Sequence, residues 1–336
     1  MTLREISDVA GVATSTVSLV LNNKPGVRKD TRDRITKLLL QNGYTIRNTD
    51  SGDSKGEIKF LRYIASGHIS ERNEDFYVRL LNGAESRARQ EGYNLSIANI
   101  GMDELPSFLS QLENQHNILG VLVLASELQK KNIPLFQNFS LPLIFLDRQL
   151  DEANVNTLAT SNIAGAYEAV HYLYRLGHRK IGMLRGQVDI GGIVERSVGY
   201  RRALRDLNLP YNENYIVDID IIFNTAVKQM EEYLNSAKDL PTAFFAANDI
   251  IAAGCIRAIQ DCGYRVPEDI SVIGFDDGSI CSFTSPPITT MRVPCDRIGA
   301  IAVERLLSIA SGSQEIIKSC VSTTLIERQS TAPLQG

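Results

Sequence analysis

The stretch from Leu3 to Asn22, LREISDVAGVATSTVSLVLN, decides how the whole chain is interpreted. Apolar residues recur at helical spacing in its first half, which predicts a short helix with one apolar face, formed by Leu3, Ile6, Val9 and Ala10. Gly11 follows and can adopt the left-handed conformation that ends a helix. A second apolar face then appears at Val17, Val20 and Leu21. The pattern predicts two short helices joined by a glycine turn, as in a helix-turn-helix.

The open side of the second predicted helix carries small polar side chains and one leucine. Such side chains fit against base edges and phosphates in a major groove. Together with a basic residue beyond the next turn, they are the candidate DNA-binding residues: Thr14, Ser15, Thr16, Ser18, Leu19, Asn22 and Arg28. Periodicity alone does not distinguish a DNA-binding hairpin from any other small helical hairpin.

The residues at these positions carry a resemblance to a known family. Ile6 to Val12, Thr16 to Ser18 and Val20 to Asn22 resemble the amino-terminal signature of the lactose-repressor family of bacterial transcription regulators. Val27, Thr31-Arg32 and Gly43-Tyr44 fit the third helix of that family and its end. The resemblance implies that residues 1–48 form a helix-turn-helix domain that binds double-stranded DNA.

Charge is distributed unevenly along the chain. The 336 residues carry a formal net charge of −4, which by itself argues against a nucleic-acid partner. Residues 1–48, however, contain eight basic and four acidic side chains, a net +4, so the remainder carries −8. A basic head on an acidic body is expected when only the head contacts phosphate.

Several classes of protein are disfavoured by composition. No apolar run approaches the ~18 residues of a membrane span, and the polar amino terminus is unlike a signal peptide. The five cysteines are an odd number without metal-type spacing, so we expect no metal site and no cofactor. A reducing cytoplasm is the simplest compartment.

A polar, glycine-containing stretch, residues 49–57, is expected to link the head to the body. Beyond it, short apolar runs alternate with helical patterns, which predicts an α/β fold with parallel sheets. The predicted strands are Ile58–Ile64, Leu95–Ile100, Leu119–Leu124, Leu143–Leu146, Lys180–Leu184, Ala243–Ala246 and Ser271–Phe275. The predicted helices include Tyr77–Glu91, Ala164–Arg175, Ser197–Leu207, Ala226–Leu234 and Ile250–Cys262.

The resemblance to the lactose-repressor family extends through the body. It is carried by the blocks Leu176–Gly182, Gly199–Leu204, Asn248-Asp249, Val266–Asp277 and Pro287–Thr290, with Gly299. It implies an effector-binding and dimerisation domain over residues 58–330, built like periplasmic binding proteins from two subdomains joined by three crossovers, which we expect near 159–162, 290–292 and 318–320. One subdomain would then comprise 58–160 and about 292–318, including a helix from Asp296 to Ile309, and the other 161–290 and about 319–330.

Polar residues that directly follow a strand face the cleft in such a fold. Asp147-Arg148, Asn248-Asp249 and Asp276-Asp277 stand in this position, and Arg196 precedes the helix expected near Ser197. The resemblance implies contacts with effector hydroxyls for Asp147, Arg196, Asn248 and Asp276. We add Arg148, and Phe76 as an aromatic that could stack on a sugar. For Asp249 and Asp277 we prefer a capping role.

Two departures from the family pattern affect the expected site. Ser161-Asn162 stands where the family often has Asp-Asn, so that contact is expected to be weaker or different. The loop from Ala65 to Asp75 is longer and more charged than the usual turn, and its His68 has no neighbouring metal ligands.

Enzyme motifs are missing from the sequence. No GxGxxG follows the first strand, and we find neither a P-loop lysine nor an assignable Ser-His-acid set. We therefore interpret the chain as a cytoplasmic, homodimeric repressor controlled by a small carbohydrate effector, and not as an enzyme. Two alternatives remain open, a carbohydrate-binding solute receptor and a sugar-processing enzyme. Dimerisation is expected on the helices containing Leu81 with Ala84 and Cys255 with Ile259.

Overall fold

The computed structural model describes residues 2–21, 26–42, 54–64, 74–101, 103–128, 130–136, 138–150, 153–187 and 191–334. The chain divides into two compact units, residues 1–55 and 56–336. No helix in these described ranges is long and apolar enough to cross a membrane.

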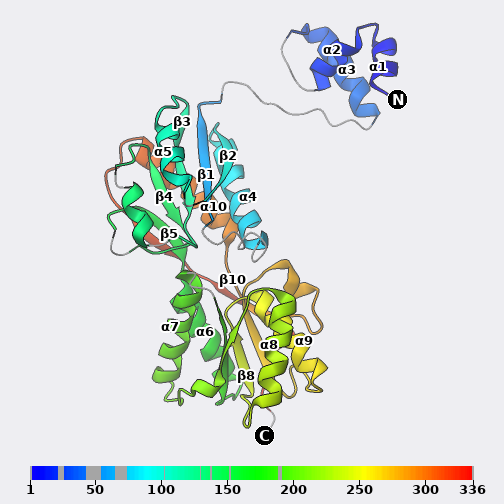
Figure 1. The fold of residues 1–336 in the computed structure, drawn as a ribbon. Helices are drawn as coiled ribbons and strands as arrows, with labels where there is room; N and C mark the ends of the chain where they lie inside the picture. Colours follow the sequence, from blue (N-terminus) through cyan, green and yellow to red (C-terminus); the bar gives the residue numbers. More distant parts are fainter. Residues whose placement is uncertain are drawn as a thin grey trace. The chain divides into compact units, whose positions relative to one another are not determined.

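The first unit is a three-helix domain formed by α1 (Leu3–Ala10), α2 (Thr14–Leu21) and α3 (Lys29–Gln41), seen in Figure 1. A reciprocal pair of hydrogen bonds between Thr2 and Glu5 caps the start of α1, and Gly11 ends it in the left-handed conformation, with φ 63°. The core is formed by Ile6, Ala10, Val17, Val20, Ile35 and Leu39. The prediction for Val9 is wrong, because this side chain is 62% exposed rather than part of the apolar face.

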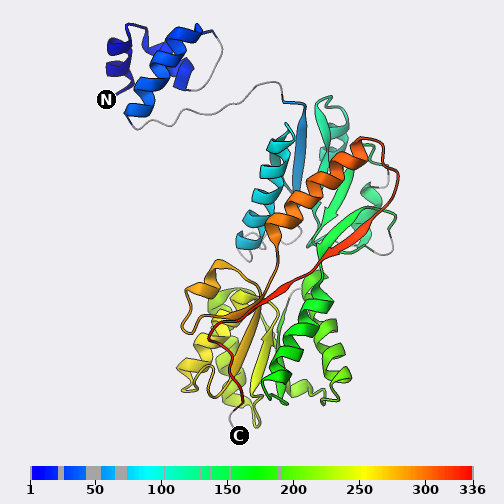
Figure 2. The ribbon, with the colours of Figure 1, turned by 180° about the vertical axis from the view of Figure 1, so that it is seen from behind.

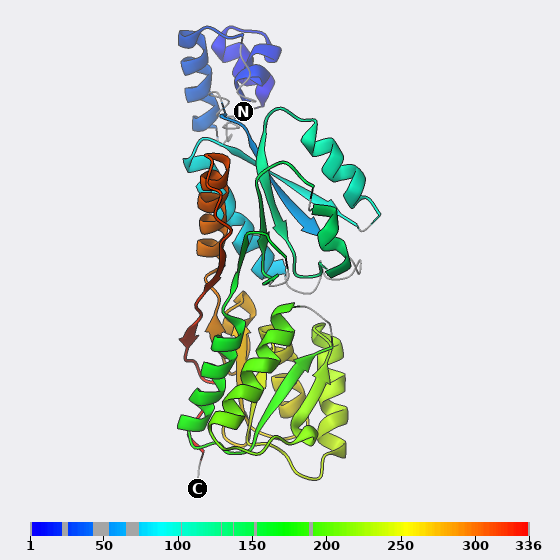
Figure 3. The same ribbon diagram turned by 90° about the vertical axis from the view of Figure 1, so that its left-hand side faces the viewer.

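The second unit contains two six-stranded sheets, and the first has the order β11-β5-β4-β3-β1-β2. All of its neighbouring strands are parallel. The strands are β1 (Glu57–Tyr63), β2 (Asn94–Ile100), β3 (Ile118–Leu124), β4 (Leu143–Leu146), β5 (Thr157–Thr160) and β11 (Lys318–Val321). Helices α4 (Glu74–Gln90) and α10 (Cys295–Ala310) cover one face, and α5 (Leu105–Glu113) with the 3-10 helix Lys130–Phe136 covers the other, as Figure 3 shows. We call this sheet and its helices the first lobe.

The second sheet has the order β12-β10-β9-β8-β6-β7, and only β12 runs antiparallel to its neighbour. Its strands are β6 (Ile181–Gly186), β7 (Ile216–Ile219), β8 (Ala243–Ala246), β9 (Ser271–Asp276), β10 (Thr289–Arg292) and β12 (Thr324–Ile326). The surrounding helices are α6 (Asn162–Arg175), α7 (Gly191–Asp206), α8 (Phe223–Ser236) and α9 (Asp249–Asp261), with short 3-10 helices at Glu213–Tyr215 and Ser279–Ser282. We call this sheet and its helices the second lobe.

The chain passes between the lobes three times, as Figure 2 shows for the later segments. The passages lie at residue 161, at residues 293–294 and at residues 322–323, between strands or helices that belong to different lobes. The passage expected near 159–162 lies in that range. Those expected near 290–292 and 318–320 begin one and two residues later, because these ranges fall inside β10 and β11. A strand that ends at a crossover is still paired with its neighbour, which the sequence pattern does not reveal.

Helices α4 and α10 approach each other at two glycines. A Cβ atom on Gly83 would lie 2.0 Å from the carbonyl oxygen of Asp296, and one on Gly299 would lie 2.1 Å from that of Leu80. The backbones of the two helices therefore touch, and neither position has room for a side chain.

The predicted dimer contacts of Ala84, Cys255 and Ile259 are wrong, because all three side chains are fully buried within the chain itself.

Candidate functional site

In the first unit, α2 turns a polar surface away from the core. Val17 and Val20 are buried, whereas Thr14 and Ser15 are exposed and Thr16, Ser18 and Leu19 are partly exposed. The hydroxyl groups of Ser7 and Thr14 lie 3.0 Å apart, which joins α1 to the first residue of α2. Arg28 is exposed directly before α3, and Asn22 lies outside the described residues. A small polar helix face beside an exposed arginine can contact bases and phosphates.

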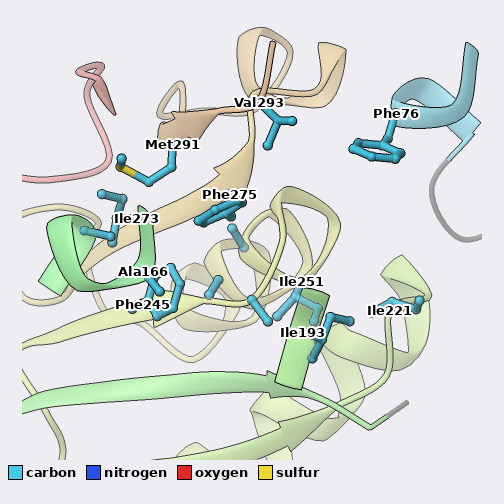
Figure 4. Close-up of a cluster of buried hydrophobic side chains, with 14 of the residues drawn as sticks. Phe76, Ala166, Ile193, Ile221, Phe245, Ile251, Ile273, Phe275, Met291 and Val293 are labelled. Atoms are coloured by element: carbon cyan, nitrogen blue, oxygen red, sulfur yellow. The ribbon is translucent and has the colours of Figure 1, made fainter. Parts of the chain in front are cut away.

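In the second unit, a cleft opens between the two lobes, at the carboxyl ends of their strands. It is lined by Arg62, Tyr63, Phe76, Tyr77, Leu124, Ser126, Glu127, Asp147, Gly192, Ile193, Arg196, Ile221, Asn248 and Asp276. Five of the six candidate effector residues are among these, and Arg148 is not. Phe76, Ile193 and Ile221 give the cleft its apolar surface, and Figure 4 shows these side chains.

Arg196 is a buried polar residue of the cleft, with 5% of its surface exposed. It lies within α7, which begins at Gly191, so the expected position before the helix is wrong. Its Nη2 donates to Asp276 Oδ1 (2.9 Å), its Nη1 to the carbonyl oxygen of Ala247 (2.6 Å) and its Nε to Asn162 Oδ1 (2.9 Å). The guanidinium also lies over the ring of Phe275, 3.8 Å from its centroid. Four neighbours therefore fix its orientation.

Asp276 joins the two lobes. Its carboxylate accepts the hydrogen bond from Arg196, and its carbonyl oxygen accepts another from Arg79 Nη2 of α4 (3.0 Å). Its φ of 107° lies in a region that is strained for a residue with a side chain. Strain of this kind is found at functional sites, where the surrounding contacts hold it in place.

Asp147 and Arg148 have different surroundings although they are adjacent. Asp147 has a φ of 65°, and its Oδ2 accepts a hydrogen bond from Ser126 Oγ (2.5 Å). Burial raises the pKa of Asp147 to about 6, and this outweighs the opposing effect of nearby Arg196. Arg148 donates to the carbonyl oxygen of Leu128 and packs beside Gly191, which turns it away from the cleft.

The remaining acidic and amide residues hold the local structure. Asn248 lines the cleft and also caps α9, with its Oδ1 accepting from the backbone N–H of Ile251 (2.9 Å). Asp249 does not cap the helix; its buried carboxylate accepts from Thr290 Oγ1 (2.6 Å) and from the backbone N–H of Gly278 (2.8 Å). The carboxylate of Asp277 likewise serves no cap, because it accepts from two arginines, Arg292 and Arg328, at 2.6 Å each.

Asn162, which the Ser161-Asn162 pair shares with the family pattern, has a structural role. Asn162 accepts the hydrogen bond from Arg196 Nε and donates from Nδ2 to Glu195 Oε2 (2.9 Å). Asn162 therefore helps to fix the orientation of the Arg196 side chain. Residues 65–73, which include His68, lie outside the described residues. Among the residues that are described, no group of three or more His, Cys, Asp or Glu side chains could hold a metal ion.

The sequence analysis missed a set of cleft residues in the first lobe. They are Arg62 and Tyr63 at the end of β1, Tyr77 on α4, and Ser126 and Glu127 after β3. Arg62 is 9% exposed; its Nη2 donates to Glu74 Oε1 (3.0 Å), and its guanidinium lies 4.2 Å from the ring centroid of Tyr77. Strand-end position, the rule that found Asp147, could have identified Arg62, Tyr63, Ser126 and Glu127.

The hydroxyl group of Tyr63 is buried and has no hydrogen-bond partner in the described part of the chain. Burial, together with the charges of Glu127 and Asp103, raises the pKa of this tyrosine, so the hydroxyl stays protonated. A buried donor without a partner costs free energy that a ligand atom can recover.

Comparison with known proteins gives matches at both ends of the chain. Residues 2–46 match the model of "Bacterial regulatory proteins, lacI family", and residues 170–331 match a periplasmic binding protein-like domain. The chain is 31% identical over 309 residues to the HTH-type transcriptional repressor PurR of Aliivibrio salmonicida, covering 91% of each chain. It is 30% identical over 337 residues to the ribose operon repressor of Haemophilus influenzae, covering 99% of each.

Solved structures are similar over the same length. A complex of the transcriptional regulator CelR with cellobiose matches with a TM-score of 0.73 and 28% identity, over 98% of this chain and 99% of that one. A lac repressor dimer bound to operator and an anti-inducer matches with a TM-score of 0.72 and 25% identity, over 99% of each. With a relative of this identity spanning nearly the whole chain, the protein belongs to the lacI family of bacterial regulatory proteins.

Proposed function

We propose that this protein is a cytoplasmic, homodimeric repressor whose operator binding is controlled by a small carbohydrate held between the two lobes. The observation that carries the proposal is the convergence of Arg196, Asp147, Asn248 and Asp276 on one cleft that also contains Phe76. Charged and amide groups form paired hydrogen bonds with neighbouring hydroxyls, and an aromatic ring suits the apolar face of a sugar. The cellobiose complex of a relative supports this choice of ligand class.

The mechanism follows from the position of the cleft. A ligand that contacts both lobes changes their relative orientation only if it binds one arrangement more tightly than the other. Asp276 is placed to transmit such a change, because it contacts Arg196 in the second lobe and Arg79 on α4 of the first. In a dimer, the change would alter the separation of the two heads, which must match half-sites about 34–36 Å apart. The protein then acts through binding alone and catalyses no reaction.

DNA binding is tested first, with the purified full-length protein. Selection from random duplexes should yield a roughly two-fold symmetric site, and sedimentation should give a dimer at micromolar concentration. Failure to select any sequence, or a monomer that binds the site equally well, would contradict the proposal.

Ligand control is tested with Asp147→Asn, and Asp218→Asn serves as the control. Asparagine tolerates the positive φ of residue 147 and keeps an acceptor for Ser126. The neutral amide loses the charged hydrogen bond from the carboxylate to a ligand hydroxyl, which is worth about 1.5–3 kcal/mol. Affinity for a sugar found by thermal-shift screening should therefore fall tenfold to a hundredfold. Asp218 pairs with Arg185 on the second sheet, outside the set of cleft residues, and its variant should bind normally. Equal affinities of the two variants would refute this role of the cleft.

A further inference from the structure

The cleft contains two arginines, and they differ in how much of their binding capacity the protein uses. The guanidinium of Arg196 is held at every nitrogen atom, since Nε, Nη1 and Nη2 each donate to a protein oxygen at 2.6–2.9 Å. Its charge is matched by Asp276 at 2.9 Å, and both side chains are buried, at 7% and 4% exposure. This centre can bind the hydroxyl groups of a ligand through its carboxylates, Asp276 and Asp147, and its positive charge is already paired.

Arg62 is the opposite case. Its side chain is only 10% exposed, yet the one carboxylate that pairs with it among the described residues is that of Glu74. Glu74 is the first residue of α4 and its side chain is 50% exposed, so water solvates it well. The ring of Tyr77 covers one side of the guanidinium. An arginine has five N–H groups, and a single partly solvated carboxylate leaves most of them open to the cleft.

The acidic residues that line the cleft are not the ion-pair partners of Arg62 among the described residues. Asp147 and Asp276 are grouped with Arg196, whose charge acts on Asp147. Glu127 is close to Tyr63 and acts on its hydroxyl group. Of the two cleft arginines, Arg62 is therefore the one whose ion pair is partly exposed and can be exchanged.

We infer that the effector is an acidic sugar, whose carboxylate or phosphate is bound by Arg62 while its hydroxyls face Arg196, Asp147 and Asp276. The inference rests on the proposed function and narrows its ligand class. The planar fork of an arginine matches the oxygen atoms of a carboxylate or phosphate and binds them in pairs. The incoming anion replaces Glu74, which is released to water at little cost because it is already half-exposed. Tyr77 holds the guanidinium in place while the partner changes.

The test measures dissociation constants by calorimetry for matched pairs of ligands on the full-length protein. Glucuronate, galacturonate and the 6-phosphates of glucose and galactose are compared with neutral glucose and galactose. The wild type should bind at least one acidic member tenfold or more tightly than its neutral parent. Separate carboxylate and phosphate members show which anion Arg62 prefers.

Three variants assign the preference to Arg62. Arg62→Met should reduce the ratio of acidic to neutral affinity to near one, and Glu74→Gln should raise it several-fold by removing the competing carboxylate. Lys59→Met is the matched control, because Lys59 is a cation on the same strand that pairs with Glu57 and lies outside the cleft-lining residues. It should leave the ratio unchanged, and a melting curve of each variant verifies that it is folded.

The outcomes separate this inference from the proposed function. An acidic sugar that binds the wild type and Arg62→Met equally tightly, or a panel in which no acidic member binds, overturns the inference. Control of DNA binding by a neutral sugar would leave the proposed function intact. Loss of sequence-selective DNA binding is a separate result that would overturn the proposed function alone.

Discussion

Asp249 is a buried carboxylate whose charge is costly to the folded protein. Burial, reinforced by the charge of Asp276, raises its pKa from an ordinary value of 3.8 to about 7. Between pH 4 and pH 7, therefore, the folded protein still holds a proton on Asp249, whereas the unfolded chain has already released it. The contribution of this group to the free energy of unfolding should fall as the pH rises through that window and stay constant above it.

The variant Asp249→Asn should remove this pH dependence, because an amide does not titrate. Urea denaturation of wild type and variant at pH 5, 6, 7 and 8 measures the difference. Asp269→Asn is the control, since hydrogen bonds from Arg265 lower the pKa of Asp269 to about 2 and the group does not titrate in this range. A wild-type stability profile that runs parallel to that of Asp249→Asn would show that the carboxylate is already ionised.

The Tyr63→Phe variant addresses the buried hydroxyl at the end of β1. Because that hydroxyl has no partner in the described residues, removing it should leave the stability of the free protein unchanged or raise it by about 1 kcal/mol. Ligand affinity should fall, because the ligand loses a donor. If Tyr63→Phe is instead less stable than the wild type in urea without ligand, the hydroxyl is hydrogen-bonded in the folded protein.

Cleft residues could be predicted from sequence where a neighbouring strand places them, and not where their position depends on contacts with distant segments. Asp147 and Asp276 directly follow or end buried strands, so the strand rule places them in the cleft. Arg196 was found through the family resemblance, since its contact with Asp276 spans 80 residues. The roles of Asp249 and Asp277 were wrong because their partners, Thr290 and Arg328, come from distant segments.

At the scale of the element, α2 should read the sequence of the operator and the residue before α3 should not. Ser15→Ala removes an exposed hydroxyl from α2 and should change the preferred sequence. Arg28→Ala should weaken binding to all sequences alike and reduce the salt dependence by about one charge, because a phosphate contact carries no sequence information. Binding-site selection and salt titration measure the two effects. An unchanged selected motif for Ser15→Ala would exclude it from base contact.

The pairing of α4 with α10 gives a prediction about stability. Gly299→Ala places a methyl group against the backbone of α4, so the helices must separate, and the free energy of unfolding should fall by about 3 kcal/mol or more. Ser86→Ala, on the exposed side of α4, is the control and should have little effect. Urea denaturation compares them; equal midpoints would mean that the helices adjust without cost.

Elements were predictable where the apolar pattern was long. The strands and helices that were predicted from sequence are present, with ends that differ by a few residues, except that α7 begins six residues earlier than expected. The short strands β5, β7, β10, β11 and β12 and the helix α5 were not predicted. The four-residue strands β4 and β8 are wholly apolar and were predicted, whereas β5 and β7 mix apolar and polar residues over too short a run to establish a period. They form because neighbouring strands pair with them.

At the scale of the whole molecule, the linker should distinguish this protein from its relatives. The sequence from Tyr44 to Ile58 contains two glycines, three acidic residues and Ile46 as its one aliphatic side chain before the first strand. Glycine opposes a helix by about 1 kcal/mol, and carboxylates are repelled by phosphate. The lactose-repressor family usually has a short hinge helix here, whose leucine wedges into the minor groove. We expect no such wedge in this chain, and therefore little bending at the centre of the operator.

A circular-permutation gel assay with the selected operator measures that bend. We expect mobility to depend weakly on the position of the site, and affinity to depend weakly on the central base pairs. A strong central kink, or residues 46–54 forming a helix in the minor groove of a complex, would disprove the expectation. With little bending, ligand control would act through dimer geometry.

The route of the chain between the lobes also has a consequence for how the protein is made. β11 completes the edge of the first sheet beside β5, and β12 completes the second beside β10, so both sheets depend on residues 318–326. A nascent chain on the ribosome therefore carries two incomplete sheets until this segment emerges. During that interval the edges of β5 and β10 expose unpaired backbone groups, which are templates for association with other chains. Both lobes therefore remain open to misassembly, and to chaperone binding, until the same short segment has been synthesised.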